Sequence, residues 1–239
     1  NSLVARSDLV VHFAAETHVT RSIYDNYHFF ETDVLGTQVL ANSVIQHIGR
    51  VERFVHVSTS EVYGSALSEK MSEEHPLQPL SPYASAKVGA DRLVYSYWAT
   101  YRLPVVILRP FNNYGPRQHL EKAIARFITS CFLHEPIRIH GDGSAQRDWI
   151  YVDDTCEAIE RVLDADIDVV VGEVFNVGSG KSLSIVDVAK SVVRETNAPD
   201  IDLEFVGDRP GQVFRHTADA RKLERLLGWT SSRSFEEGL

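Results

Sequence analysis

The sequence has little sulfur and no long apolar run. Its 239 residues include two cysteines, Cys131 and Cys156, and one methionine. Two cysteines so far apart fit neither a disulfide framework nor the close spacing of a metal site, so we expect packed thiols in a reducing cytoplasm and no bound metal. No apolar stretch approaches the ~20 residues of a membrane helix, and no signal peptide is recognisable, so no membrane partner is expected.

Positive charge is also in short supply. The formal net charge is -9 at pH 7, the sequence pI is about 5.6, and lysines and arginines form no cluster. A protein that binds nucleic acid through a basic surface needs the opposite balance, so nucleic acid is excluded as a primary partner. The 44% hydrophobic content is ordinary for a globular chain that buries a core.

What the first half does contain is a regular alternation of strand and helix patterns. Strand-like runs are Asp8 to Phe13, Arg53 to Val57 and Pro104 to Arg109. Between them lie a helix from Asp33 to Ile48, with Asp33 as its cap, and a helix that Ser81 caps. This βαβαβ order predicts an α/β fold with a doubly wound parallel sheet. Residues 110–117 are predicted as a loop, and Asp154 and Ser184 are expected to cap later helices.

The most informative stretch runs from Ser58 to Lys87. Thr59, Ser60 and Glu61 follow a buried strand, at the sheet edge where open α/β folds place their chemistry. Tyr83 and Lys87 are four residues apart and share a helix face. We expect the lysine charge to lower the tyrosine pKa and make a proton-transfer pair, with the Thr59 hydroxyl binding the same substrate oxygen.

These motifs resemble the extended short-chain dehydrogenase/reductases of the NAD-dependent epimerase/dehydratase family, in particular the dTDP-glucose 4,6-dehydratases. The resemblance rests on His12-Phe-Ala-Ala15, the Thr59 to Lys87 stretch, Arg109 to Pro116, Gly141 to Val152, Phe175 to Gly178 and Asp208-Arg-Pro-Gly211. It implies a Rossmann-type NAD-binding domain over residues 1–110 with a return segment near 150–180. Residues 111–239 would mainly form a smaller, interleaved α/β domain that binds a nucleotide sugar.

The resemblance also implies roles for particular residues. The catalytic ones are Thr59, Ser60, Glu61, Tyr83 and Lys87. The expected NAD contacts are Ala14, Ala15, Thr17, Ser58, Tyr83, Lys87 and Asn112. The expected substrate contacts are His18, Asn112, Asn113, Arg117, Lys122, Arg147, Asn176, Arg209 and Gln212.

The implied reaction begins when Tyr83 takes the proton of the sugar 4-hydroxyl while hydride leaves C4 for NAD. Glu61 then removes the C5 proton, water departs from C6, and the hydride returns to C6. Without such a carboxylate, the same oxidation leads more naturally to 4-epimerisation. A nucleotide-sugar 4-epimerase, a UDP-glucuronate decarboxylase and a binding module without turnover therefore stay open as alternatives.

Three departures from the family pattern bear on these expectations. Ser60 stands where dTDP-glucose dehydratases usually carry aspartate, and Gln212 stands where they tend to have histidine, so the sugar and the base are open. The glycine-rich pyrophosphate turn has no counterpart before Asp8. We therefore expect a fragment of a longer protein, with an exposed apolar strand edge and weak NAD binding by these residues alone. The resemblance implies that the full-length protein is a homodimer.

Overall fold

Four parallel strands form the main sheet of the protein, whose computed structural model describes residues 1–239. Their order is β1-β2-β3-β7, and every neighbouring pair is parallel. The strands are β1 (Leu9–His12), β2 (Arg53–Val57), β3 (Val105–Pro110) and β7 (Val174–Val177). The three strands predicted in the first half are confirmed, and β1 forms one edge of this sheet.

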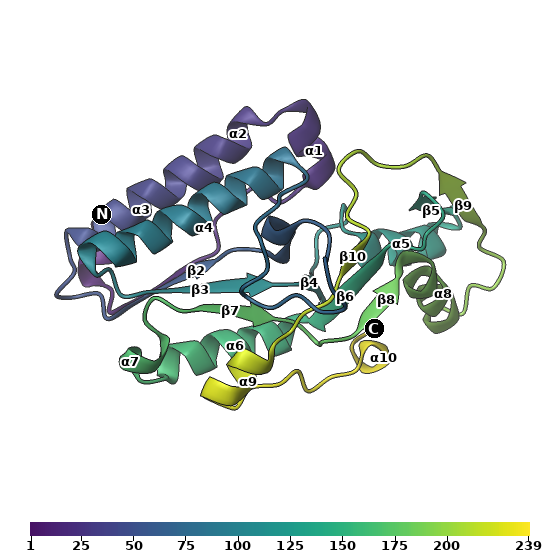
Figure 1. Cartoon of the computed structure of the whole chain (residues 1–239). Helices are drawn as coiled ribbons and strands as arrows, with labels where there is room; N and C mark the ends of the chain where they lie inside the picture. Colours follow the sequence, from purple (N-terminus) through teal and green to yellow (C-terminus); the bar gives the residue numbers. More distant parts are fainter.

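Helices cover both faces of this sheet (Figure 1). The upper layer in that view comprises α2 (Tyr27–Phe29), the π-helical segment η2 (Phe30–Leu35), α3 (Gly36–Ile45) and α4 (Pro82–Tyr101). The lower layer comprises α6 (Val152–Asp164) and α9 (Arg221–Leu227). The doubly wound α/β fold expected from the sequence is therefore confirmed.

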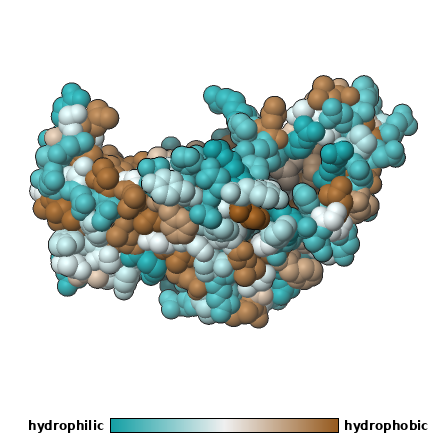
Figure 2. Space-filling model, turned by 90° about the horizontal axis from the view of Figure 1, so that it is seen from above, coloured by the Kyte–Doolittle hydropathy of each residue, from teal (hydrophilic) through white to brown (hydrophobic).

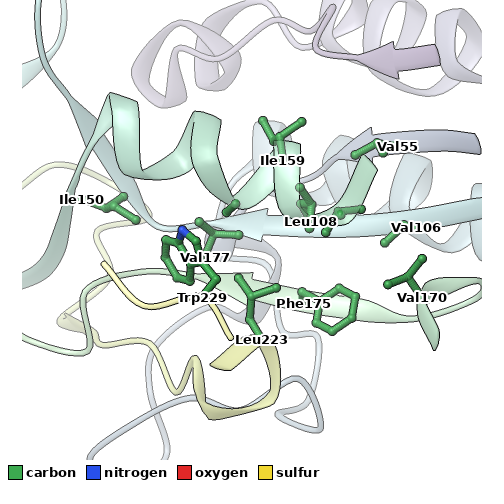
Figure 3. Packing of buried hydrophobic residues seen from close by; sticks show 12 residues of the cluster. Val55, Val106, Leu108, Ile150, Ile159, Val170, Phe175, Val177, Leu223 and Trp229 are labelled. Atoms are coloured by element: carbon green, nitrogen blue, oxygen red, sulfur yellow. The ribbon is translucent and has the colours of Figure 1, made fainter. Parts of the chain in front are cut away.

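The side chains of each strand divide between these two layers because successive residues of a strand point to opposite faces. Phe54 of β2 packs in a core with residues of α3 and α4. Its neighbour Val55 packs in a second core with Ile159 of α6 and Trp229 (Figure 3). Residues buried on both sides explain why these strands read as continuous apolar runs.

The second part of the chain forms two smaller sheets. In one, β6 (Gln146–Tyr151) lies between β10 (Arg215–His216) and β4 (Asn112–Tyr114), and β8 (Ser182–Ser184) pairs antiparallel with β6. In the other, β5 (Ile137–His140) pairs in parallel with β9 (Leu203–Val206). Two helices, α5 (Ala123–Leu133) and α8 (Ile185–Glu195), build a third core over these strands.

The remaining elements are short. They are η1 (Val4–Arg6), α1 (Val19–Tyr24), η3 (Ser60–Tyr63), α7 (Ile167–Val170) and α10 (Phe235–Gly238). None of the helices combines the length and the apolar character needed to cross a lipid bilayer.

Asp33 does not cap a helix, contrary to the prediction. The helical run begins earlier, at Tyr27, and Asp33 lies inside the wide turn of η2. Its side chain is buried, and Oδ1 accepts a hydrogen bond of 2.7 Å from the Glu16 backbone amide. The carboxylate thus ties the loop after β1 to the helical layer, and α3 ends at Ile45 rather than at Ile48.

Two other local predictions were also wrong. Helix α6 begins at Val152, before Asp154, whose buried carboxylate instead accepts hydrogen bonds from Ser232 and from the Arg233 backbone amide. Residues 112–114 were predicted as part of a loop but form β4, which pairs with β6. In both cases contacts with distant parts of the chain decide the local structure. Ser184 does cap its helix, accepting from the Asp187 amide.

Candidate active site

The first part of the candidate site is the turn that follows β2. Thr59 has extended backbone angles, and its hydroxyl accepts a hydrogen bond of 3.2 Å from the Glu61 backbone amide. This cap starts the short helix η3 directly at the end of the strand. Thr59, Ser60 and Glu61 therefore lie at the carboxyl end of β2, as the sequence predicted.

Helix α4 brings Tyr83 and Lys87 to the same strand end. Ser81 caps the helix by accepting from the Ala84 amide, and Pro82 occupies the first helical position, so both predictions about this helix start are confirmed. The Lys87 ammonium donates a hydrogen bond of 2.9 Å to the Val57 carbonyl at the end of β2. The Tyr83 hydroxyl interacts with Thr59, and the structure thus gathers Thr59, Tyr83 and Lys87 in one place.

The acidity of Tyr83 differs from the expectation. Burial raises the pKa of Tyr83 and outweighs the lowering effect of its hydrogen bond with Thr59, while the charges of Glu61 and Asp33 raise it further. Burial in turn lowers the pKa of Lys87, against the opposing effects of Asp33 and Asp91. The predicted lowering of the Tyr83 pKa by Lys87 is therefore not found, because desolvation dominates.

Glu61 lies among positively charged and ionisable groups. Its Oε1 is 3.9 Å from Nδ1 of His216, and its negative charge acts on Lys122 and Arg147, raising the pKa of each against the effect of burial. Lys122 also donates to the Thr17 carbonyl at 2.9 Å and to the Thr17 hydroxyl at 3.0 Å. The carboxylate of Glu61 thus faces the second part of the molecule as well as Tyr83.

Several predicted substrate contacts lie in this basic surrounding. Arg147 is buried, and its charge and that of Arg209 act on each other. The Nε atom of Arg209 is buried without a hydrogen-bond partner. His18 caps α1 by accepting from the Arg21 amide, and its Nε2 lies 3.8 Å from Glu121. Together with Lys122, the two arginines form a cationic group suited to phosphate oxygens.

Four other predicted contacts show no such involvement. Arg117 is exposed, and Gln212 is half-buried, with its backbone amide donating a hydrogen bond to the Arg209 carbonyl. The Asn113 side chain accepts from the Thr155 hydroxyl at 2.6 Å and donates to the Phe111 carbonyl. Asn176 is fully buried, and its amide is bonded to Tyr63, to the Met71 carbonyl and to that of Asp219. The structure does not bring Asn113 or Asn176 to the catalytic group with a free amide.

The residues predicted to hold NAD fit a flat dinucleotide. Ala14 and Ala15 put small side chains on the segment after β1, where backbone and ligand can approach closely, and Ala14 is exposed. Ser58 is buried at the end of β2, and the side-chain carbonyl of Asn112 is buried without a hydrogen-bond partner. An unpartnered buried acceptor suits a polar ligand that can donate a hydrogen bond, such as a ribose or an amide.

His216 is the group that the sequence reasoning missed. It lies on β10, more than 150 positions after Ser60, and reaches the end of β2 because β10 pairs with β6. Its Nδ1 is 3.4 Å from the Ser60 hydroxyl. No local motif surrounds this histidine, so only the pairing of distant strands could have revealed it.

A parallel sheet wound on both faces, with threonine, tyrosine and lysine at a strand end, defines the extended short-chain dehydrogenase/reductase class. The chain belongs to the GDP-mannose 4,6 dehydratase family, whose model matches residues 2–239. The family resemblance predicted from the sequence is therefore confirmed.

Individual relatives agree with this assignment. The low-salt glycan biosynthesis protein Agl12 of Haloferax volcanii is 44% identical over 240 residues, which cover 100% of this chain and 75% of that protein. The dTDP-glucose 4,6-dehydratase DesIV of Streptomyces venezuelae, solved with NAD bound, is 40% identical with a TM-score of 0.93, covering 99% of this chain and 73% of that one.

A UDP-glucuronic acid 4-epimerase is similarly close in structure. The enzyme of Bacillus cereus, solved with UDP-glucuronic acid and NAD, has a TM-score of 0.94 at 32% identity, covering 99% of this chain and 74% of that one. Dehydratases and epimerases therefore share this fold, and both neighbours hold NAD. The choice between the two reactions depends on side chains rather than on the fold.

Proposed function

We propose that the protein is an NAD-dependent nucleotide-sugar 4,6-dehydratase that converts an NDP-hexose to an NDP-4-keto-6-deoxyhexose. The observation that carries this proposal is the position of Glu61, two residues after Thr59 and close enough to Tyr83 for its charge to act on the phenol. A carboxylate at this point supplies a base for a second proton, which a simple oxidation at C4 does not need.

In the first step Tyr83 removes the proton of the sugar 4-hydroxyl while Thr59 hydrogen-bonds the same oxygen. NAD supplies the acceptor and later the donor of hydride. Lys87, held by the Val57 carbonyl at the end of β2, stabilises the negative charge that forms on Tyr83. This help is needed because burial otherwise disfavours the phenolate.

In the second step the 4-ketone makes the C5 hydrogen acidic, and Glu61 removes it. The electron pair forms the C5–C6 double bond as the C6 hydroxyl departs as water. Ser60, next to Glu61, lies where it can interact with that leaving oxygen. With NAD bound, hydride would return to C6, and C5 would take up a proton that balances the one Tyr83 removed from the 4-hydroxyl.

The cationic group supports a diphosphate-linked substrate. We propose that Lys122, Arg147 and Arg209 bind the diphosphate, with His18, Arg117 and Gln212 nearer its periphery. Asn112, with its unpartnered carbonyl, belongs to the NAD contacts together with Ala14, Ala15, Thr17 and Ser58. Asn113 and Asn176 are left out, because their amides are bonded within the fold.

We further propose that residues 1–110 and the return segment near 150–180 bind NAD and that residues 111–239 mainly bind the sugar nucleotide. The placement of β7 in the main sheet and of α6 against it supports this division. A cytoplasmic homodimer that binds neither nucleic acid nor membrane completes the proposal. The exposed apolar side chains of the upper helical layer support the dimer.

The test is a product assay on the protein at its full natural length, loaded with NAD. We would supply dTDP-glucose, GDP-mannose, UDP-N-acetylglucosamine and UDP-glucuronate in turn and read the products by mass and by the absorbance of the 4-keto sugar in alkali. We expect one substrate to lose water. Glu61→Gln should retain the first oxidation, seen as NADH absorbance, but lose at least ~100-fold in water release.

Glu69→Gln is the matched control, since Glu69 is exposed on the loop after η3. Interconversion of 4-epimers with no change in mass would assign an epimerase instead, as the Bacillus cereus neighbour suggests. Release of carbon dioxide from UDP-glucuronate would assign a decarboxylase. No turnover of any substrate would leave a binding module.

A further inference from the structure

The loss of water from C6 requires a proton for the departing oxygen. A serine hydroxyl such as that of Ser60 can deliver a proton only if another group replaces it at once, because an alkoxide is strongly basic. The structure places one ionisable side chain in contact with Ser60, namely His216.

The hydrogen bonds of His216 define its tautomer. Nε2 is 2.6 Å from the Gly64 carbonyl oxygen, which can only accept, so Nε2 carries the hydrogen. In the neutral ring Nδ1 therefore has a free lone pair. It faces the Ser60 hydroxyl at 3.4 Å and Oε1 of Glu61 at 3.9 Å, and so lies between the two groups.

The surroundings keep this ring fixed and neutral. The side chain is fully buried, and its ring packs edge-on against Phe111 with centroids 6.1 Å apart. Burial and the charges of Arg147 and His75 lower the pKa of His216, against the opposing effect of Glu61. A neutral acceptor beside a carboxylate can form a hydrogen bond to it only after that carboxylate has gained a proton.

We propose that His216 is a positioning residue that carries the proton from Glu61 to Ser60 during dehydration, an inference that rests on the proposed dehydratase function. Glu61 takes the C5 proton as the C5–H pair moves into the C5–C6 bond. Glu61 passes this proton to Nδ1 of His216, Nδ1 passes it to Ser60, and the hydroxyl proton of Ser60 goes to the leaving C6 oxygen. The departing oxygen keeps the C6–O pair and leaves as water, so no external acid is consumed.

This relay predicts that a His216→Phe variant exchanges the C5 hydrogen faster than it releases water. C5 deprotonation continues, because Glu61 is intact, but protonation of the leaving oxygen becomes slow. In deuterium oxide the variant should therefore exchange the C5 hydrogen of the substrate for deuterium, while water loss falls by about 100-fold. Mass spectrometry of recovered substrate and of product measures the two rates in the same reaction.

Two further variants separate the relay from a structural effect. Ser60→Asp in the His216→Phe background supplies an acid directly and should restore water loss at least 10-fold. His47→Phe is the matched control, because His47 lies just after the carboxyl end of α3 and its ring is hydrogen-bonded to Asn1 rather than to Ser60 or Glu61. It should release water at the wild-type rate.

The outcomes are distinct. Unchanged water loss in His216→Phe, or an equal fall in exchange and water loss without rescue by Ser60→Asp, would overturn the relay. A variant that fails to fold would be judged on Ser60→Ala, which the relay requires to show the same excess of exchange over water loss. If the wild-type protein releases no water from any sugar nucleotide, the proposed function itself fails, and the relay fails with it.

Discussion

Single buried residues set the chemistry of the candidate site. Tyr83 and Lys87 are both almost entirely buried, and desolvation disfavours the charged form of each, so the pKa of Tyr83 rises, that of Lys87 falls, and both groups favour the neutral form. From the sequence we expected the lysine charge to dominate. Desolvation cannot be read from a spacing of four residues, because it depends on the tertiary packing around α4.

Buried histidines make a second residue-scale feature. His56 of β2 is buried with neither ring nitrogen hydrogen-bonded, and its ring lies 5.5 Å from that of His12. Burial lowers the pKa of His56 well below 6.5 and that of His12 to about 4, and the charge of Lys87 acts in the same direction. Both rings are thus neutral in the folded protein at pH 7.

This feature predicts how a His56→Leu variant responds to pH. In the unfolded chain the histidine gains a proton near pH 6.5, whereas in the folded protein it does so only at much lower pH. The wild-type free energy of unfolding is therefore unaffected by His56 protonation above pH 6.5 and declines as the pH falls below that value. The variant lacks that loss, so its free energy of unfolding relative to wild type should rise by ~1.4 kcal/mol per pH unit below 6.5.

Urea denaturation between pH 7.5 and 5 measures this difference. Phe54→Leu serves as the control, since Phe54 is buried on the same strand and carries no ionisable group, so its replacement should change stability equally at all pH values. A constant difference between His56→Leu and wild type across this range would contradict the account.

At the scale of elements, one buried ion pair joins helix α4 to strand β3. Arg109 donates through Nε to Asp91 Oδ2 at 2.9 Å and through Nη2 to Oδ1 at 3.0 Å, and both side chains are buried. The guanidinium also lies over the Tyr63 ring, 4.9 Å from its centroid. The pair lowers the pKa of Asp91 to about 2 despite its burial. The bidentate geometry fixes the helix against the sheet.

Asp91→Ala should therefore destabilise the protein by about 3–5 kcal/mol, because it leaves the Arg109 charge buried without its partner. The exposed pair Arg138–Glu204, with an Nε–Oε2 distance of 2.9 Å, is the comparison. Glu204→Ala should cost less than ~1 kcal/mol. Chemical denaturation of the two variants gives both numbers, and similar losses for both would show that burial does not matter here.

The accuracy of the element predictions follows from where each signal lies. Ser81 and Ser184 cap helices as predicted, since a cap is formed within three residues. Asp33 and Asp154 are equally good caps by residue type, yet their carboxylates bind the Glu16 amide and the segment at Ser232. Partners so distant in the chain leave no mark on the local sequence.

At the scale of the whole molecule, the main sheet could be predicted because each of its first three strands is a local apolar run. The sheet around β6 could not be predicted in the same way. Its strands β4, β8 and β10 are only two or three residues long, and each forms by pairing with β6. The predicted residues of the β2 end and α4 were therefore found together. His216, which depends on β10, was missed for the same reason.

The proposed homodimer also belongs to this scale. Exposed apolar side chains of the upper helical layer include Tyr27, Phe30 and Val39. Figure 2, which views the molecule from above, shows apolar surface interspersed with polar surface. Val39 is 66% exposed on α3. A charge at the centre of such a contact would lose water without gaining a partner, so Val39→Asp should convert the dimer to a monomer.

Light scattering after size exclusion measures the mass of each variant. Phe132→Asp is the matched control, because Phe132 is 73% exposed but lies on α5, in the other part of the molecule. It should leave the dimer intact. A monomeric wild-type protein, or a dimer that tolerates Val39→Asp, would rule out this face.

The wide turn of η2 has a consequence for how this chain can change over generations. A π-helical turn holds one residue more than an α-helical turn, and each residue rotates a helix by about 100°. Deleting one residue from Phe30–Leu35 would rotate the preceding helices α1 and α2 relative to α3. It would also move the Asp33 carboxylate away from the Glu16 amide. Substitutions in this turn should be tolerated in descendants far more often than changes in its length.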